Sequence, residues 1–426
     1  MHFWNSFSFK SPLLIGALSL VGSVGANPPT AITLGEALQR AEVSNPTLAA
    51  GRLSVRATEA LTDQADLRPN PTLDLELENF GGSGPLQGID GVAATLLASQ
   101  RIERGDKRSR RVALANARTE VARQGIAVRL THLRHQTATA YIETLVAARR
   151  VALAQGIVAA TQDAIEAINQ RVADGRASPA ESARARAAIV SARVALNRAE
   201  SSRKKAHAAL GLTWGDPAAE IAPADTLPTT LALPDQLALF SKMESHARLD
   251  LQRSEISRRQ RALDLQHAAA KSDLMIGGGV RFLNEGSDAA FVAGISWPLP
   301  IRNQNQGNIR AAREDLAAAA QSVDGVRNEL QLAFMTAWQD LTAAHTAAET
   351  LRHEARPAVE EVYAITRQAF EEGQVGLVEV VLAARERIAL ETDILAAEAT
   401  YALALVELDA LTDPTFPLTT ALLTSP

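Results

Sequence analysis

The sequence is duplicated, and this duplication restricts the folds that the chain can adopt. The segment 44-SNPTL-48 aligns with 245-SHARL-249 at an offset of 201 residues (245 − 44), and Gly175 aligns with Gly373 at an offset of 198 (373 − 175). Small insertions and deletions account for the difference between the two offsets. Each half therefore carries the same order of elements, and the fold must be built from two copies of one structural unit.

Apolar periodicity, prolines and glycines predict helix, strand, strand, very long helix and helix in each half. In the first half we expect a helix from Thr33 to Asp66, strands near 72–80 and 90–100, a helix from about Lys107 to Val172, and a helix from about Pro179 to Leu210. In the second half we expect a helix near 235–270, strands near 273–283 and 289–298, a long helix near 308–371, and a last helix to about Leu411.

The helix expected from Lys107 to Val172 sets the overall shape. Its second half carries β-branched residues seven positions apart, at Val151, Val158, Ile165 and Val172, which is the spacing of a coiled-coil seam. About 65 residues at 1.5 Å per residue give a rod of roughly 100 Å. The helices before the strands and after the tip turn are each about half as long. We therefore expect each half to be an elongated helical hairpin with two strands at one end and a tight turn at the other.

The N-terminus has the pattern of a secretory signal peptide. Lys10 precedes an apolar run from Leu13 to Val24, and the small residues that follow predict cleavage after Ala26. The alternative, a membrane anchor, needs about 20 apolar residues, more than this run offers. We accordingly divide the chain into signal peptide 1–26, first repeat 27–212, linker 213–234, second repeat 235–412 and C-terminal tail 413–426.

The first strand of the first repeat, 71-PTLDLELENFGG-82, alternates leucine with acidic residues. The leucines are Leu73, Leu75 and Leu77, and the acids are Asp74, Glu76 and Glu78. On a strand this alternation places the leucines on one face and the carboxylates on the other. The helices have little apolar surface left to cover the leucines, because their own apolar stripes pack against one another. A lipid environment for the leucine face is the explanation that we favour.

A sheet in lipid must be closed, because the backbone groups of an open edge would remain unpaired in hydrocarbon. Four strands of about ten residues have the length of membrane-spanning strands, but known barrels of this kind begin at about eight strands. Two chains would supply eight strands and three chains twelve, and the pattern does not choose between them. The alternative is a periplasmic α+β protein in which a small sheet caps a helical bundle.

Composition excludes several function classes. The formal net charge of −5 offers no general electrostatic reason to bind nucleic acid. The chain has no cysteine, so disulfides and thiolate metal sites are absent. No nucleotide-binding loop, GxSxG elbow or HExxH motif occurs, and we expect neither an enzyme nor a bound cofactor.

Three segments carry a resemblance to a known family: 69-PNPTLDLELENFGGSG-84, 99-SQRIERGDKRSRR-111 and 298-PLPIRNQNQGNI-309. The mature chain resembles the TolC-like outer-membrane efflux channels, especially the outer-membrane component of cobalt–zinc–cadmium efflux systems. Arg101 stands where that family commonly has proline, and Arg104-Gly105-Asp106 departs from its Leu-Gly-Gly run.

The resemblance implies a mainly α fold with a transmembrane β-barrel. Three chains would form a twelve-stranded barrel in the outer membrane of a Gram-negative bacterium, continued by a periplasmic barrel of helices. The homotrimer would contact outer-membrane lipid and would be the passive exit duct of a tripartite pump, with a periplasmic adaptor (membrane fusion) protein and an inner-membrane RND transporter. Heavy-metal cations are the implied cargo. A duct for drugs, organic compounds or secreted protein, and a soluble periplasmic coiled-coil scaffold, remain as alternatives.

Two groups of residues are candidates for function in such a channel. If the leucines face lipid, then Asp74, Glu76, Glu78 and Arg281 face the lumen. Carboxylates repeated around a channel would concentrate cations, although any such barrel has a polar lining. The second group lies at the tip turns and would contact the adaptor or gate the aperture: Arg171, Asp174, Gly175, Arg176, Arg367, Glu371, Glu372 and Gly373. The alternative for this group is a solvated helix end.

Three further features have simpler explanations. His132 and His135 lie one helical turn apart, as metal ligands do, but no carboxylate cluster is near them in the sequence, and we expect a pair of partly exposed helix residues. Tyr141 and Trp338 match across the repeat and are expected to pack in the interior. The basic run 107-KRSRR-111 is expected to form a solvated or interfacial surface.

Overall fold

The computed structural model describes residues 30–89, 91–175, 178–219, 221–227, 231–284, 286 and 288–424. The segment 1–26, with its predicted cleavage after Ala26, lies outside the described residues, as does Arg176 of the first tip turn.

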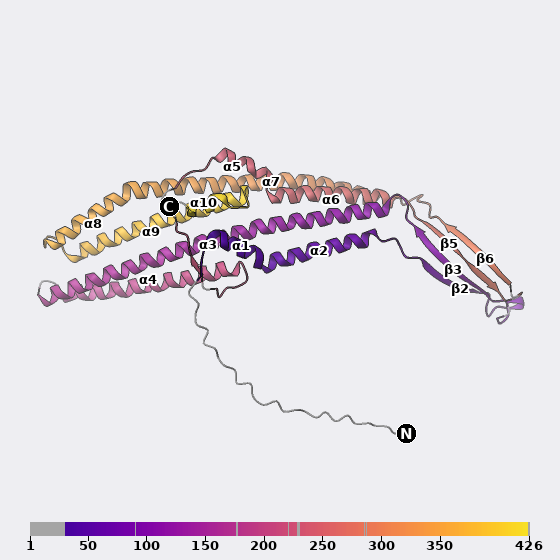
Figure 1. Cartoon of the computed structure of the whole chain (residues 1–426), viewed down its shortest axis with the longest axis horizontal. Helices are drawn as coiled ribbons and strands as arrows, with labels where there is room; N and C mark the ends of the chain where they lie inside the picture. Colours follow the sequence, from indigo (N-terminus) through magenta and orange to yellow (C-terminus); the bar gives the residue numbers. More distant parts are fainter. Residues whose placement is uncertain are drawn as a thin grey trace, which may run out of the picture.

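The chain forms an elongated rod of helices with a four-stranded sheet at one end (Figure 1). Helix α3 (Lys107–Ala173) has 67 residues and runs along the rod for about 100 Å. Helix α2 (Pro46–Asp66) packs along its sheet-side half, and helix α4 (Pro179–Leu212) packs along the other half. The first repeat is therefore a helical hairpin in which two shorter helices match one long helix.

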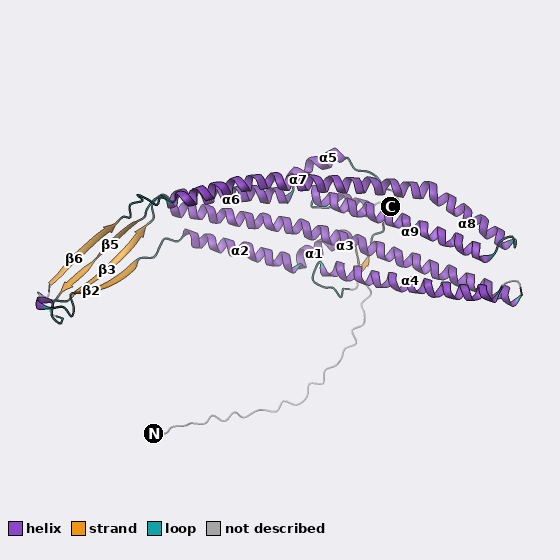
Figure 2. Cartoon of the chain, turned by 180° about the vertical axis from the view of Figure 1, so that it is seen from behind, coloured by secondary structure: helices purple, strands orange, loops and turns teal. Residues whose placement is uncertain are grey.

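The second repeat has the same design. Helix α6 (Ala247–Ala269) packs against α7 (Gln306–Thr350) on the sheet side. Helix α9 (Leu377–Thr412) packs against α7 and α8 (Arg356–Glu371) toward the far end. Both views show the two hairpins side by side, with their turns at the end of the rod opposite the sheet (Figures 1 and 2).

The helix predicted from Thr33 to Asp66 is divided in two. Helix α1 (Leu34–Ser44) ends before Asn45, whose extended backbone begins α2. Asn45 accepts a hydrogen bond from the Leu48 N–H (2.9 Å) and donates one to the Thr213 carbonyl (2.7 Å). Proline at position 46 disfavours helical backbone in the residue before it, and asparagine is a preferred N-cap. The break is therefore encoded locally.

The helix predicted near 235–270 is also divided. It forms α5 (Gln236–Lys242), a short 3₁₀ turn (Met243–Ser245) and α6, with an extended residue at His246. The long helix predicted near 308–371 is helical throughout, but a π-helical turn, Leu351–Ala355, separates α7 from α8. Pro357 follows that turn and has no N–H to donate, which displaces the regular hydrogen-bond ladder.

The sheet joins the two repeats. Its antiparallel order is β2 (Thr72–Glu78), β3 (Ala93–Ile102), β5 (Leu274–Leu283) and β6 (Asp288–Ser296). Strand β3 of the first repeat pairs with β5 of the second. In the described part of the chain, the outer edges of β2 and β6 have no strand partner.

Two strands and one helix were not expected from the sequence. Strand β1 (Thr30–Ile32) pairs in parallel with β4 (Ile221–Pro223) of the linker at the middle of the rod. Helix α10 (Pro417–Thr424) lies in the predicted C-terminal tail and packs against α9. The two ends of the described chain and the linker thus meet at one level, which we call the waist.

Two buried tyrosines fasten the linker at the waist. The Tyr141 hydroxyl oxygen lies 2.8 Å from the Ile32 carbonyl oxygen and 2.7 Å from Oδ2 of Asp225, and burial raises the pKa of this phenol. The same carboxylate accepts the Leu34 N–H at 2.9 Å, at the start of α1. Tyr401 donates to the carbonyl of Ala232. The tyrosines are interior residues that also hold the two repeats to the segment that connects them.

Asp409 on α9 holds helix α10 in place. Its carboxylate is fully buried and accepts the backbone N–H groups of Leu418 (3.2 Å) and Thr419 (2.7 Å), and the Thr419 hydroxyl (2.7 Å). Burial raises the pKa of this carboxyl to about 6 despite these hydrogen bonds. The side chain therefore titrates close to neutral pH.

Asp409→Asn should remove one component of the pH dependence of stability. Because the folded carboxyl has a pKa of about 6 against an ordinary 3.8, the folded state binds this proton more tightly than the unfolded chain. The free energy of unfolding should therefore fall by about 2 kcal/mol as the pH rises from about 4 to about 6, and by about 3 kcal/mol in total once the pH has passed both pKa values. Denaturant unfolding of the detergent-solubilised proteins at several pH values measures this. The fall in the free energy of unfolding should occur in the wild type and be absent from Asp409→Asn. Equal pH dependence in both proteins would contradict the prediction.

Candidate functional site: the two faces of the sheet

One face of the sheet is apolar across all four strands. Directly paired residues of antiparallel strands lie on the same face, and the register places Leu75, Leu96, Val280 and Phe291 in one row. The other apolar members of this face are Leu73, Leu77, Ala94, Ala98, Ile102, Leu274, Ile276, Gly278, Phe282, Ala289, Ala293 and Ile295, with Gln100 as a polar residue at the helix-side end. We call this set the apolar face.

The apolar face is uncovered in the described chain. Leu75 is 67% exposed and Phe291 is 94% exposed. The sheet projects beyond the ends of the helices, so no described helix lies over it (Figure 2). A sheet that capped a helical bundle would bury this face against the helices. The arrangement therefore disfavours the α+β alternative.

The opposite face, which we call the polar face, carries every charged residue of the four strands. The predicted lumen residues Asp74, Glu76, Glu78 and Arg281 all lie on it. Two further members, Arg101 and Asp288, were missed because each lies one residue outside the strands predicted near 90–100 and 289–298. The six groups, four carboxylates and two guanidiniums, give the polar face a net charge of −2.

Arg281 alters the predicted electrostatics of this face. Its Nη2 lies 2.9 Å from Oε2 of Glu78, and its Nε donates to the Thr95 hydroxyl at 2.8 Å. From the sequence we expected all three acids of β2 to be unpaired charges. In the structure the charge of Glu78 is neutralised by Arg281, which lies 203 positions away in the chain. Asp74 and Glu76 form no ion pair with another described residue.

The polar face also requires a close approach of two strands. A Cβ atom added at Gly279 would lie 2.0 Å from the Leu96 carbonyl oxygen, so no side chain fits between β5 and β3 there. Gly277 is nearly as crowded, since its Cβ would lie 2.8 Å from Oγ of Ser99. The glycines thus permit the close approach of β5 to β3, across which Arg281 reaches Glu78 of β2.

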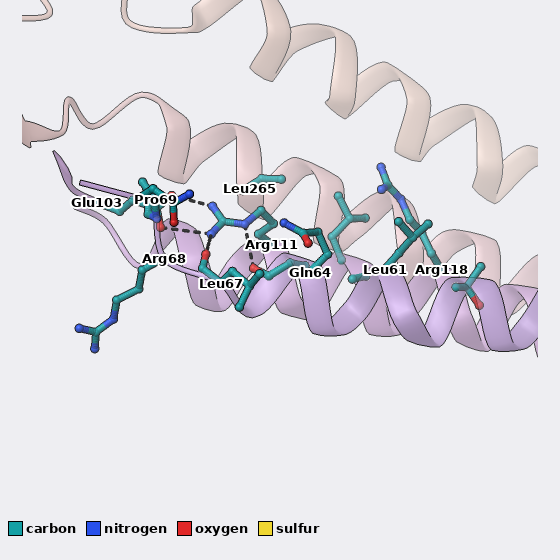
Figure 3. A pocket seen from close by; sticks show the side chains of 14 residues that line it. Leu61, Gln64, Leu67, Arg68, Pro69, Glu103, Arg111, Arg118 and Leu265 are labelled. Carbon is teal, nitrogen blue, oxygen red and sulfur yellow. Dashed lines mark hydrogen bonds and ion pairs between the residues drawn. The ribbon is translucent and has the colours of Figure 1, made fainter. Parts of the chain in front are cut away.

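The basic run 107-KRSRR-111, expected to form a solvated or interfacial surface, joins the sheet to the helices through specific ion pairs. Arg111 forms a bidentate ion pair with Glu103, with Nη1 2.6 Å from Oε1 and Nη2 3.2 Å from Oε2. The hydrogen bond to Glu103 is the main cause of the raised pKa of the guanidinium. Arg111 also donates to the carbonyls of Ala65 (2.9 Å) and Leu67 (3.1 Å), at the end of α2 (Figure 3).

Two neighbouring cations extend this joint. Arg108 pairs with Asp66 (2.7 Å), and Lys107 pairs with Asp273 at the start of β5 (2.6 Å). The run therefore ties the end of α2, the start of α3 and the second repeat together where the strands begin. Its partners are distant in sequence, which is why the run alone did not reveal them.

Glycine shapes both tip turns. Gly175 and Gly373 have φ angles of +69° and +77°, the left-handed conformation that glycine adopts at helix ends. Their N–H groups donate to the carbonyls of Val172 and Phe370, both at 3.0 Å. Each turn therefore closes a long helix and reverses the chain within a few residues.

Among the other described tip residues, Arg171 contacts the second hairpin and the charged residues that remain make local contacts. The guanidinium of Arg171 lies 4.9 Å from the ring centre of Phe370, a cation–π contact between the two hairpins that the sequence did not reveal. Arg367 pairs with Glu371 within α8 (3.3 Å). The two remaining acids accept hydrogen bonds from glutamines: Asp174 from Gln170, and Glu372 from Gln368 and Gln374.

The histidines do not form a metal centre in the described structure. Nε2 of His135 lies 2.8 Å from Oε2 of Glu407, and this hydrogen bond lowers the pKa of the carboxyl. His132 does not take part in the contact between His135 and Glu407. No group of three potential metal ligands occurs among the described residues. None of the described helices has the length and apolar character needed to cross a membrane.

The comparisons with known proteins agree on one family. The outer membrane efflux protein family matches residues 37–216 and 281–412, which include the helices of the first hairpin from α2 to α4 and helices α7, α8 and α9 of the second. The cobalt-zinc-cadmium resistance protein CzcC of Cupriavidus metallidurans is 28% identical over 358 residues, covering 83% of each chain. The nickel and cobalt resistance protein CnrC of the same organism is 27% identical, covering 72% of this chain and 73% of CnrC.

A solved structure shows the same fold. The outer-membrane channel OprN superposes with a TM-score of 0.73 over 90% of this chain and 91% of its own, at 16% sequence identity.

Arg111→Met should weaken the joint between sheet and helices. The variant loses the ion pair with Glu103 and leaves two carbonyls without their donor, so we expect the free energy of unfolding to fall by about 1–3 kcal/mol. Arg110→Met is the matched control, because Arg110 is exposed and lies 3.7 Å from Asp264. That control should cost less than about 1 kcal/mol. Equal losses in denaturant unfolding would show that the joint has no special role.

Proposed function

The chain belongs to the outer membrane efflux protein family, and we propose that three copies form a passive exit duct for heavy-metal cations through the outer membrane. The family consists of channels rather than enzymes, in line with the expectation from the sequence. Transport energy would come from an inner-membrane RND transporter, connected to the duct by a periplasmic adaptor protein that engages the tip turns.

The single observation that supports this proposal is the apolar face with its two free edges. Lipid satisfies the apolar side chains, but the unpaired edges of β2 and β6 need hydrogen-bond partners in the bilayer. Pairing β2 of one copy with β6 of the next supplies them. Three copies of a four-stranded sheet then give twelve strands, which exceeds the smallest known barrels of about eight.

Metal cargo is supported by the relatives and by the charge of the polar face. CzcC and CnrC are named for resistance to cobalt, zinc, cadmium and nickel. In the closed barrel the polar face lines the lumen, and its net charge of −2 per chain would be repeated three times. Such a field concentrates cations and disfavours anions without binding them tightly, as an exit duct requires.

Leu96→Arg and Leu97→Arg test the assignment of the faces with one pair of adjacent residues. Leu96 lies on the apolar face and Leu97 on the polar face. An arginine facing lipid costs about 2–4 kcal/mol near the bilayer centre, whereas one facing the lumen remains hydrated. Outer-membrane fractionation should recover Leu97→Arg and show strongly reduced Leu96→Arg. Equal recovery of both variants would refute the assignment.

The two unpaired acids and Arg281 should act on ion selectivity in opposite directions. Asp74→Asn combined with Glu76→Gln removes two negative charges and should lower the cation preference. Arg281→Gln releases the charge of Glu78 and should raise it. The reversal potential of channels in planar bilayers under a salt gradient measures both changes. If neither variant shifts the reversal potential, the polar face does not select the ion.

The cargo is tested by deleting the chain from its host. The deletion strain should lose resistance to at least one of cobalt, zinc, cadmium and nickel, and should keep normal tolerance of drugs and detergents. Complementation with the wild-type chain should restore growth on the metal. Drug sensitivity with unchanged metal tolerance would instead favour a TolC-like duct for organic compounds.

A further inference from the structure

The helix-side border of the apolar face has its own chemistry. Three exposed apolar residues, Trp297, Leu299 and Ile301, follow β6, and Ile102 ends β3 on the same border. Tryptophan is enriched at the boundary between the hydrocarbon core and the headgroups in membrane barrels. If the apolar face lies in lipid, this border lies at headgroup level in the leaflet nearest the helices.

Arg104 covers the exposed tryptophan of this border. It lies between β3 and α3, and its guanidinium carbon is 5.0 Å from the ring centre of Trp297. A guanidinium held over an aromatic ring in this way still has N–H groups that can donate to an anion. Arg104 has no ion-pair partner among the described residues.

A second cation lies beside Arg104. A Cβ atom added at Gly105 would lie 2.6 Å from Cδ of Lys271, so the lysine stem crosses the backbone next to Arg104. Lys271 is exposed and likewise lacks an ion-pair partner in the described chain. Glycine at 105 is what allows the lysine stem to pack against the backbone beside Arg104.

The nearby acids do not cancel these two charges. Asp273 pairs with Lys107 at 2.6 Å and also accepts the backbone N–H of Arg104 at 3.1 Å. Asp106 begins α3, where a carboxylate is favourable to the helix dipole. Counting Arg104, Lys107, Lys271 and these two acids, the cluster keeps a net charge of +1.

We propose that Arg104 and Lys271, with Trp297 beneath them, bind the phosphodiester headgroup of an acidic phospholipid. The proposal rests on the proposed function, since it requires the apolar face to lie in a bilayer. Arginine recognises phosphate oxygens through paired N–H donors, lysine adds a mobile charge, and the indole lies where the acyl chains begin. Each chain carries one such site, built from both repeats.

Tryptophan fluorescence can test the proposal on the full-length purified protein. Trp214 is buried at the waist and Trp338 packs against the core there, whereas Trp297 lies at the membrane border. Subtracting the signal of Trp297→Phe therefore isolates the membrane tryptophan. The protein is reconstituted in vesicles of phosphatidylcholine and phosphatidylglycerol, with bromine quenchers on the acyl chains of one lipid at a time.

In the wild type, brominated phosphatidylglycerol should quench Trp297 more strongly than its mole fraction in the vesicle predicts. Arg104→Gln with Lys271→Gln should reduce this preference by about fivefold for each charge removed. Arg313→Gln, which removes an exposed charge from α7, is the matched control and should leave the preference unchanged.

Three outcomes would overturn the proposal, and they differ from one another. Quenching by both lipids in proportion to mole fraction would reject the headgroup site and leave the membrane duct intact. Absence of quenching by either lipid would place Trp297 outside the bilayer and would reject the proposed function as well. A preference in the Arg104→Gln, Lys271→Gln variant equal to that of the wild type would show that these two cations do not bind the headgroup.

Discussion

The structure depends on one constraint: the backbone at the two edges of the sheet must find hydrogen-bond partners. In the described chain, β2 and β6 present unpaired edges beside a largely exposed apolar face. Water would satisfy the edges but not the leucines, and lipid would satisfy the leucines but not the edges. A single chain can meet only one of these demands. Edge-to-edge assembly of identical copies would meet both, and the proposed oligomer therefore rests on the same residues that form the apolar face.

The duplicated helices must hold that sheet in a fixed orientation over a rod of about 100 Å. Two regions provide the rigidity. At the waist, Tyr141 and Tyr401 fasten the linker to the two hairpins. At the sheet, Arg111 and its neighbours tie the end of α2 to the start of α3. The tips have mainly local contacts and the cation–π contact of Arg171, which leaves that end with fewer restraints.

On the polar face, an ion pair between strands changes the net charge that the acids of β2 contribute. The acids of β2 look equivalent in sequence, yet Arg281 neutralises Glu78 and leaves Asp74 and Glu76 free. The charge that an ion would meet is therefore set by a contact between the two repeats. At the border of the apolar face, pairing leaves positive rather than negative charge. Asp273 forms its ion pair with Lys107, so the positive charges of Arg104 and Lys271 remain uncompensated.

The sequence by itself determined the features that depend on local periodicity. Alternation in β2 assigned the leucines and acids to opposite faces, heptad spacing predicted the rod, and Gly175 and Gly373 marked its turns, because these patterns act through neighbours on one element. Tertiary structure decided what depends on residues far apart. The pairing of Arg281 with Glu78, the partners of 107-KRSRR-111 and the parallel pair β1–β4 all join segments separated in the chain. No local pattern specifies which distant group a charge or a strand edge will meet, since that choice is made only when the two repeats pack together.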